Sequence, residues 1–209
     1  VRKATTIPSR TIQTIKATLK QSSADRNRQL KEIGDEIFRP RLSQRSEVSL
    51  FTLGGFGQVG RSSMLLSTPE SKILIDCGLF QGVKELRLKN REAIPFDLSK
   101  LDVVLLTHAH LDHCGYLPRL VRDGFKGPIF ATETTKDIAR IILLDAAKIQ
   151  LEEIREAKKL NLSKHQIGEP LYFDHEVKNA LNHFRPLGYR DPVSIGPFEI
   201  ILHQAGHIP

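Results

Sequence analysis

The chain has 209 residues, of which 31 are Lys or Arg and 24 are Asp or Glu, so its formal net charge is +7. An apolar share of 40% and a charged share of 26% are ordinary for a globular protein, and they exclude a wholly disordered chain, a collagen and a coiled coil. No apolar run approaches the roughly 18 residues that a membrane helix needs, so we expect no membrane partner.

Residues 1–47 carry most of the basic excess. They contain 11 Lys or Arg and 5 Asp or Glu, a net charge of +6, whereas residues 48–209 have a net charge of +1. Apolar residues recur at helical spacing twice in this segment, at Ile12, Ile15 and Leu19 and again at Leu30, Ile33 and Ile37. We predict a basic N-terminal extension that forms two short amphipathic helices or a partly disordered arm. Such a segment acts as a linker or docking arm, or it contacts nucleic acid.

A segment of different composition begins at residue 48. Val48–Leu53 is rich in β-forming residues and is followed by the four glycines of Gly54–Gly60, which allow tight turns. Residues 55–60 fit the Gly-x-Gly-x-x-Gly pattern of dinucleotide-binding proteins, but that pattern requires a helix to follow. Residues 61–69 instead predict another strand that ends in a turn, so the nucleotide-binding alternative is weak.

Short apolar strands lead into polar residues. The predicted strand Lys72–Asp76 ends in an acid, the strand Leu101–Thr107 runs into His108, and Gly127–Ala131 predicts a third strand. Continuous apolar strands are covered on both faces, as in α/β sheets. In such sheets, chemistry gathers at the carboxyl ends of the strands. We therefore predict an α/β fold with Asp76 and His108 at the functional edge of its sheet.

A long helix is predicted over residues 135–160, with Thr132 or Thr134 as its cap. Its first half is apolar on a wide face that should pack on the sheet, made of Ile138, Ile141, Ile142, Ala146 and Ile149. Its second half is charged and should be exposed. A further helix is predicted at Asp174–Asn182 and a strand at Phe198–His203.

The strongest functional signal is His108-Ala-His110-Leu-Asp112-His113. Three imidazoles and a carboxylate fall within six positions directly after an apolar strand, and both groups are ordinary zinc ligands. In an extended loop, residues two apart point the same way, so His108 and His110 can bind one ion together. Asp112 and His113 can face a second ion beside it. Two ions roughly 3.5–4 Å apart are the usual arrangement for hydrolysing phosphodiesters.

The other histidines and the two cysteines have weaker claims to a metal. Four histidines lack a partner at ligand spacing and are expected to be surface or packing residues: His165, His175, His183 and His203. Cys77 and Cys114 flank the motifs, but small buried cysteines are common, so we do not expect a thiolate ligand. Two cysteines are also too few for a disulfide scaffold, which favours a reducing, cytoplasmic setting.

These motifs resemble the metallo-β-lactamase superfamily. His108–His113 resembles its His-x-His-x-Asp-His signature, and Asp76 looks like its first motif, an acid at a strand end. Gln204-Ala-Gly-His207-Ile-Pro209 resembles the third motif as it occurs in the β-CASP branch of RNA-processing nucleases. Three further stretches resemble that branch: Gly54–Gly60, Asp76–Gly82 and Gly115–Leu120. The resemblance covers residues 48–209.

The resemblance implies an αββα sandwich. Residues 48–209 would supply only its N-terminal half, without the β-CASP cap domain, behind the extension at residues 1–47. An Asp that bridges both ions and the cap-domain histidines would lie further on. A half sandwich would leave an apolar sheet face open to water. We therefore expect that the chain is part of a longer protein or that something else covers that face.

The resemblance also implies roles for the site residues. The zinc ligands would be His108, His110 and His207 for one ion and Asp112 and His113 for the other. Asp76 would orient the ligands and the attacking water. The predicted catalytic residues are therefore Asp76 and Asp112.

The predicted function is a zinc-dependent phosphodiester hydrolase acting on RNA, a β-CASP-type ribonuclease in which metal-bound hydroxide attacks phosphorus. The full-length protein would be the enzyme, as a homodimer or a subunit of a processing complex. The isolated 209-residue chain is expected to be inactive. Two alternatives remain open. One is a metallo-hydrolase of DNA, a thioester or a lactam, and the other is a non-catalytic scaffold subunit for RNA processing.

Overall fold

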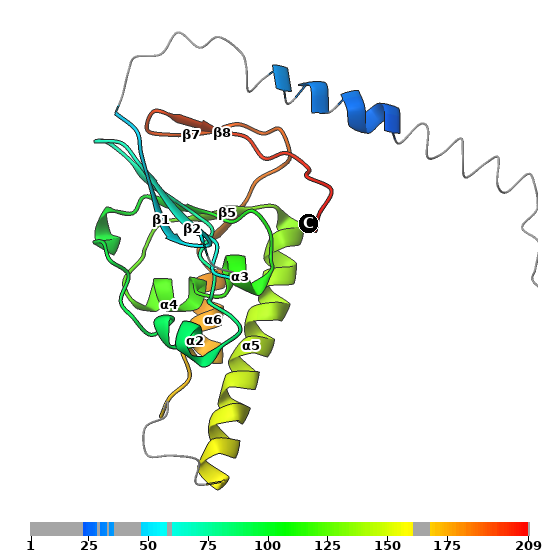
Figure 1. Ribbon diagram of the computed structural model, residues 1–209. Helices are drawn as coiled ribbons and strands as arrows, with labels where there is room; N and C mark the ends of the chain where they lie inside the picture. Colours follow the sequence, from blue (N-terminus) through cyan, green and yellow to red (C-terminus); the bar gives the residue numbers. More distant parts are fainter. Residues whose placement is uncertain are drawn as a thin grey trace, which may run out of the picture. The chain divides into compact units, whose positions relative to one another are not determined.

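The computed structural model describes residues 23–28, 30–32, 34–35, 47–57, 60–160 and 168–208 (Figure 1). The chain divides into two units, residues 1–44 and 45–209. In the first unit, the described residues between 23 and 35 are helical. In the second unit, helices and a mixed sheet form a common core.

The helix in residues 23–35 differs from the prediction at its start. The prediction rested on the apolar repeat that begins at Leu30, but residues 23–28 are already helical. A local ion pair supports the helix there, since a guanidinium nitrogen of Arg28 lies 2.9 Å from a carboxylate oxygen of Asp25 one turn earlier. The other predicted helix, around Ile12, Ile15 and Leu19, lies outside the described residues.

A six-stranded sheet organises residues 45–209, and its strands lie side by side in chain order. They are β1 (Ser49–Gly54), β2 (Ser63–Ser67), β3 (Lys72–Ile75), β4 (Val103–Leu105), β5 (Ile129–Ala131) and β6 (Phe184–Pro186). β1, β2 and β3 pair antiparallel, while β3 to β6 pair parallel. A separate antiparallel hairpin follows, β7 (Val193–Ile195) and β8 (Phe198–Ile200).

Helices connect the parallel strands. They are α2 (Lys84–Lys89), a 3-10 turn (Leu98–Lys100), α3 (Leu111–Cys114), α4 (Leu117–Arg122), α5 (Glu133–Lys159) and α6 (Asp174–Leu181). In Figure 1, α2, α4 and α6 lie on one side of the sheet and the β7–β8 hairpin on the other. The connections between parallel strands place helices against the sheet, as expected for such crossovers. The predicted α/β fold class is confirmed.

The core lies between the sheet and these helices. Leu74, Val104 and Ile129 in the central strands are fully buried, and they belong to one apolar cluster with Leu120 of α4 and Leu143 of α5. Burying each such side chain stabilises the fold by about 1.5–3 kcal/mol. This packing fixes the positions of β3 and β4, whose carboxyl ends carry the predicted site.

The face through which α5 packs on the core agrees in part with the predicted one, since Ile138 and Ile142 pack against the core and Ala146 is buried. Thr132 caps the helix, since its hydroxyl accepts the backbone N–H of Thr135 at 3.1 Å. Ile141 and Ile149, predicted to face the sheet, are 68% and 47% exposed. The buried face consists of Thr135, Ala139, Leu143, Ala146 and Ala147. These residues recur at spacings of three and four, and the small alanines permit close approach to the elements beneath.

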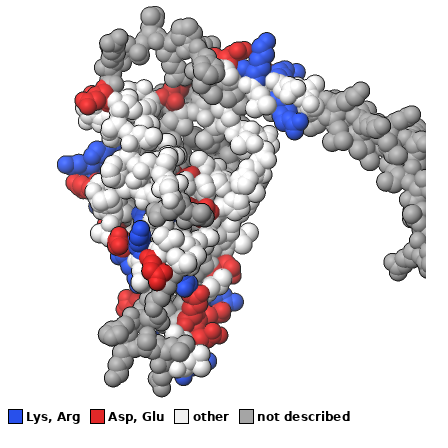
Figure 2. Space-filling view, viewed as in Figure 1, with Lys and Arg blue, Asp and Glu red and all other residues white. Residues whose placement is uncertain are grey.

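The charged second half of α5 is exposed, as predicted. Figure 2 shows Lys, Arg, Asp and Glu side chains gathered over the C-terminal end of this helix. Among the described residues, no helix combines the length and apolar character required to cross a membrane.

The sheet face away from the helices is only partly covered in the described part of the chain. Ile73 and Val103 pair across β3 and β4 on this face and are buried, whereas the next residues on it, Ile75 and Leu105, are half-buried. The β7–β8 hairpin lies on this side (Figure 1), where Gly196 approaches Ser71 so closely that an added Cβ would meet its hydroxyl. The hairpin thus supplies part of the cover that a half sandwich was expected to need.

Candidate metal centre

The site lies where β3 and β4 end. Because these two strands are parallel neighbours, the residues that follow them meet at one edge of the sheet. The backbone N–H of Thr107, after β4, donates to Oδ1 of Asp76, after β3, at 2.8 Å. Asp76 has a left-handed backbone (φ 58°), a conformation that a short polar side chain tolerates better than most.

Three imidazoles converge beside this edge. His108 and His110 come from the loop after β4, and His207 comes from the segment after β8, 97 residues beyond His110. Nε2 of His108 and Nδ1 of His110 lie 3.0 Å apart, and Nε2 of His207 lies 3.3 Å from the same His110 nitrogen. One nitrogen from each ring lies within 4.8 Å of the others. Three converging imidazoles fit one tetrahedral metal ion with a fourth position left open.

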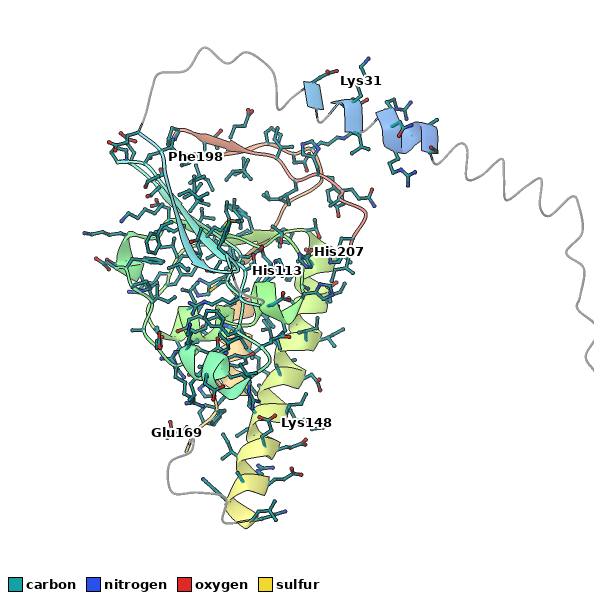
Figure 3. The ribbon with its side chains drawn as sticks, viewed as in Figure 1. Lys31, His113, Lys148, Glu169, Phe198 and His207 are labelled. Carbon is teal, nitrogen blue, oxygen red and sulfur yellow. The ribbon has the colours of Figure 1, made fainter. Side chains whose placement is uncertain are left out.

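Asp112 and His113 lie on α3 next to the three imidazoles. Nε2 of His113 is 3.7 Å from Oδ2 of Asp112, so an imidazole nitrogen and a carboxylate oxygen face the same space. The rings of His108 and His113 have centroids 4.0 Å apart. Figure 3 shows His113 and His207 on the same side of the sheet's edge. This pair is therefore a second donor set directly beside the first.

Asp76 fixes the orientation of His113 in the second donor set. Its side chain is 3% exposed, and its Oδ2 accepts a hydrogen bond from Nδ1 of His113 at 2.7 Å. A carboxylate can only accept, so the proton of His113 is on Nδ1. The lone pair of Nε2 is thereby left for a metal.

Thr107 does the same for His108, a role that the sequence did not indicate. Its hydroxyl lies 2.9 and 3.0 Å from the two oxygens of Asp76 and 3.0 Å from Nδ1 of His108. The hydroxyl has one proton, which it donates to the carboxylate. In its contact with His108 the hydroxyl is therefore the acceptor, and Nδ1 of His108 carries the proton. Nε2 of His108 is then the free acceptor, and it is the atom that faces His110.

Burial and nearby charges shift the pKa values of His108 and His113 in opposite directions. Burial, and then the charge of His113, lowers the pKa of His108, which favours the neutral form that ligates metals. Burial alone would lower the pKa of His113 too. The hydrogen bond to Asp76 and the charges of Asp76 and Asp112 overcome it and raise that pKa. A bound cation would compete with this proton.

Backbone hydrogen bonds tie the glycine-rich loop before β2 and the segment after β3 to the second donor set. Ser62 N–H donates to the carbonyl of Asp112 at 2.7 Å, and Cys77 N–H donates to that of His113 at 2.7 Å. Gly78 N–H in turn donates to the carbonyl of Ser62 at 3.1 Å. A Cβ on Gly78 would lie 1.5 Å from the carbonyl oxygen of Asp112. Only glycine therefore fits there without moving the loop that carries the donors.

Comparison with known proteins places this geometry in a family. Residues 56–148 match the family model described as the metallo-beta-lactamase superfamily. These residues form part of a metallo-β-lactamase superfamily domain. Divalent-metal binding is implied by this domain, in agreement with the converging imidazoles.

The relatives agree with the predicted β-CASP branch of the superfamily. The chain is 43% identical over 215 residues to a transcription termination factor, FttA, of Cenarchaeum symbiosum, covering 100% of this chain and 31% of that protein. It is 38% identical over 156 residues to a ribonuclease of Thermus thermophilus, covering 75% of this chain and 32% of that protein. The chain thus spans about a third of the length of these relatives.

Solved structures of the superfamily overlap more loosely. A subclass B3 metallo-β-lactamase from a soil metagenome library is 19% identical and has a TM-score of 0.39, covering 68% of this chain and 45% of that chain.

The cysteines near the superfamily motifs are held in the neutral thiol form. Both are buried, and burial raises the pKa of each thiol to about 12. Cys114 donates its S–H to the carbonyl of Ala109 at 3.3 Å. Neither belongs to the cluster of potential ligands found in the described residues.

The remaining histidines of the described chain lie apart from that cluster. His183 contacts the carbonyl of Gly127 through Nδ1 at 2.9 Å, and His175 stacks on Phe173 with ring centroids 5.8 Å apart. His203 also has a polar or ring partner. His165 lies outside the described residues.

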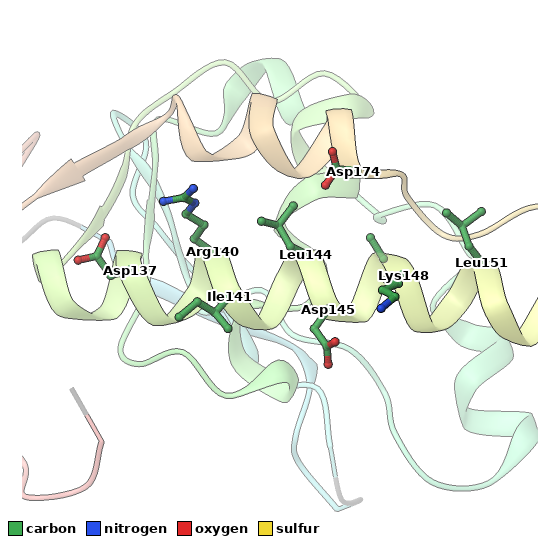
Figure 4. A pocket seen from close by; sticks show the side chains of 9 residues that line it. Asp137, Arg140, Ile141, Leu144, Asp145, Lys148, Leu151 and Asp174 are labelled. Carbon is green, nitrogen blue, oxygen red and sulfur yellow. The ribbon is translucent and has the colours of Figure 1, made fainter.

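Two open grooves mark the described surface. One, of about 980 Å³, runs along α5 and includes Asp174 of α6. Figure 4 shows its mixture of acidic, basic and apolar side chains, which contains no histidine or cysteine. The other, of about 430 Å³, is lined by the loop between β1 and β2 and by Asp112 and His113. Only the second groove adjoins the proposed metal ligands.

Proposed function

We propose that the full-length protein is a zinc-dependent phosphodiester hydrolase acting on RNA. The observation that carries the proposal is the convergence of three imidazole nitrogens within 4.8 Å of one another, directly beside Asp112 and His113. Two adjacent donor sets match the paired ions used in hydrolysing phosphodiesters. The relatives named a transcription termination factor and a ribonuclease favour RNA over other substrates.

In this proposal one zinc is held by His108, His110 and His207, and a second by Asp112 and His113 with ligands from beyond this span. Bound zinc supplies a nucleophile at neutral pH and offsets charge on the phosphoryl oxygens. Asp112 is the catalytic carboxylate that faces the reacting atoms. Its side chain is 39% exposed, so water and a substrate phosphate can reach it.

Asp76 contributes to the proposed reaction by orienting the metal ligands. It fixes His113 directly and His108 through the hydroxyl of Thr107. Both imidazoles therefore present Nε2 before a metal arrives, which lowers the cost of ordering the site. Because Asp76 is nearly buried and contacts these residues, its role in the proposal is to position the ligands.

Residues 1–47 are proposed to be a separate basic extension, and residues 48–209 the first part of the catalytic domain. The net charge of +6 on the extension would add nonspecific attraction to phosphates, screened by salt. A cytoplasmic location and assembly as a homodimer or in a processing complex complete the proposal.

A substrate panel tests the proposed reaction. The full-length protein is incubated with labelled single-stranded RNA, the same sequence as DNA, a chromogenic lactam and a thioester. We expect cleavage of the RNA well above that of the other three substrates. Hydrolysis of the lactam or thioester without RNA cleavage would support the other hydrolase class. RNA binding with no hydrolysis of any substrate would support the scaffold alternative.

A further inference from the structure

An exposed aromatic ring lines the groove beside the metal donors. The groove of about 430 Å³ is bounded by Asp112 and His113 on one side and by the loop between β1 and β2 on the other. Phe56 lies in this loop and is 60% exposed. Among the described residues of the lining, Asp112 is the one Asp, Glu, Lys or Arg, and the others are glycines, Phe56, Ser62, Met64 and His113.

The loop that carries Phe56 is held to the site by its backbone. Gly55 and Gly57 on either side of Phe56 have left-handed φ values of 81° and 71°, which glycine adopts without strain. At the end of the loop, Ser62 N–H donates to the carbonyl of Asp112 at 2.7 Å. Phe56 is therefore presented by a loop whose end is bonded to the same residue that supplies a metal donor.

A buried arginine further fixes that end of the loop. Arg61 is 7% exposed, and its guanidinium carbon lies 5.1 Å from the ring centroid of Phe80 and 5.2 Å from that of Tyr116. Such cation–π contacts are strongest where the cation is desolvated. The loop is anchored in the core, while its aromatic residue is left in the solvent.

We propose that Phe56 is a stacking platform for a base of single-stranded RNA next to the scissile phosphate. This inference rests on the proposed function, because it places the phosphate at the donors of Asp112 and His113. An aromatic ring can stack with any base, so it binds RNA without reading its sequence. The glycines of the lining have no side chains, so a sugar–phosphate backbone can approach closely. A neutral groove with one acid would attract a basic peptide poorly, whereas bound cations would draw in a phosphate.

The test combines protein variants with abasic substrates. Cleavage of single-stranded RNA by the full-length protein is measured as kcat/KM for wild type, Phe56→Ala, Phe56→Trp and Phe51→Ala. Phe51 is a matched control, because it is a phenylalanine of similar exposure, 57%, outside the groove lining. A set of oligonucleotides carries one abasic position each, moved stepwise across the cleavage site.

We expect Phe56→Ala to lower kcat/KM by about 5- to 140-fold, the range that loss of one stacked base gives. Phe56→Trp should stay near wild type, and so should Phe51→Ala. One abasic position should weaken cleavage by wild type by a similar factor. For the Phe56→Ala variant, an abasic residue at that same position of the RNA should not lower kcat/KM further, because the aromatic stacking partner is already absent.

Two results would overturn the inference while leaving the proposed function standing. One is Phe56→Ala cleaving RNA as fast as wild type. The other is an abasic penalty that persists undiminished in Phe56→Ala at every position. If wild type itself cleaves no RNA, the proposed function fails. Equilibrium binding of the same oligonucleotides then tests whether Phe56 stacks on a base. Equal affinity of wild type and Phe56→Ala would show that it does not.

Discussion

His110→Ala is expected to lower the rate of RNA cleavage by the full-length protein by about a thousandfold or more, because a metal contributes several kcal/mol to such reactions. His110 is the central imidazole of its set. Its Nδ1 lies 3.0 Å from Nε2 of His108 and 3.3 Å from Nε2 of His207. Without His110, only two imidazole nitrogens remain to bind the metal. Two imidazoles and an open face hold zinc far less well than three.

The measurement is single-turnover cleavage of end-labelled RNA at saturating protein. His175→Ala is the matched control, since His175 is an exposed histidine of α6 that stacks on Phe173 and lies outside the ligand cluster. Because His110 is itself exposed, both variants should unfold at the wild-type temperature. Cleavage by His110→Ala within tenfold of wild type would remove His110 from the proposed site.

Gly78→Ala should destabilise residues 45–209 by about 3 kcal/mol or more, at the upper end of overpacking costs. The added Cβ would lie 1.5 Å from the carbonyl oxygen and 2.1 Å from the carbonyl carbon of Asp112. Both atoms are backbone, so no side-chain rotation relieves the clash. Moving the chain apart would break the bonds that join Gly78 to Ser62 and Ser62 to Asp112.

Urea unfolding followed by circular dichroism measures this effect. Gly168→Ala is the control, because a Cβ on Gly168 would meet nothing within 4 Å. We expect the midpoint of Gly78→Ala to fall sharply and that of Gly168→Ala to stay at the wild-type value. Equal midpoints for Gly78→Ala and wild type would show that the close approach to Asp112 is not needed.

The edge of the sheet could be predicted from the sequence because the signal is local. Apolar runs marked β3 and β4, and each led directly into a polar residue, Asp76 or His108. Parallel pairing then had to bring the two ends together. His207 lies 97 residues from His110, so local spacing could not connect them. Only the resemblance to a known motif did.

Other features depend on contacts that no spacing reveals. The isoleucines of α5 suggested a packing face, and Ile138 and Ile142 do pack against the core. Ile141 and Ile149 are exposed, and the centre of the packing face is formed by the small residues Ala139 and Ala147, which permit close approach. The role of Thr107 comes from its hydroxyl group near Asp76, and that of Ser62 from its backbone N–H, which donates to the carbonyl of Asp112. Serine and threonine are too common in loops for their position alone to indicate such partners. Thr107 directly precedes His108 in the sequence, but its contact with Asp76 could be recognised only from the structure.

We expect RNA cleavage by the full-length protein to depend on metal held by these residues. The most direct measurement is cleavage of single-stranded RNA by full-length protein stripped of metal with a chelator, followed by stepwise addition of zinc. The stripped protein should be inactive, and activity should return as zinc fills the site. Cleavage by the stripped protein at the wild-type rate would contradict this expectation.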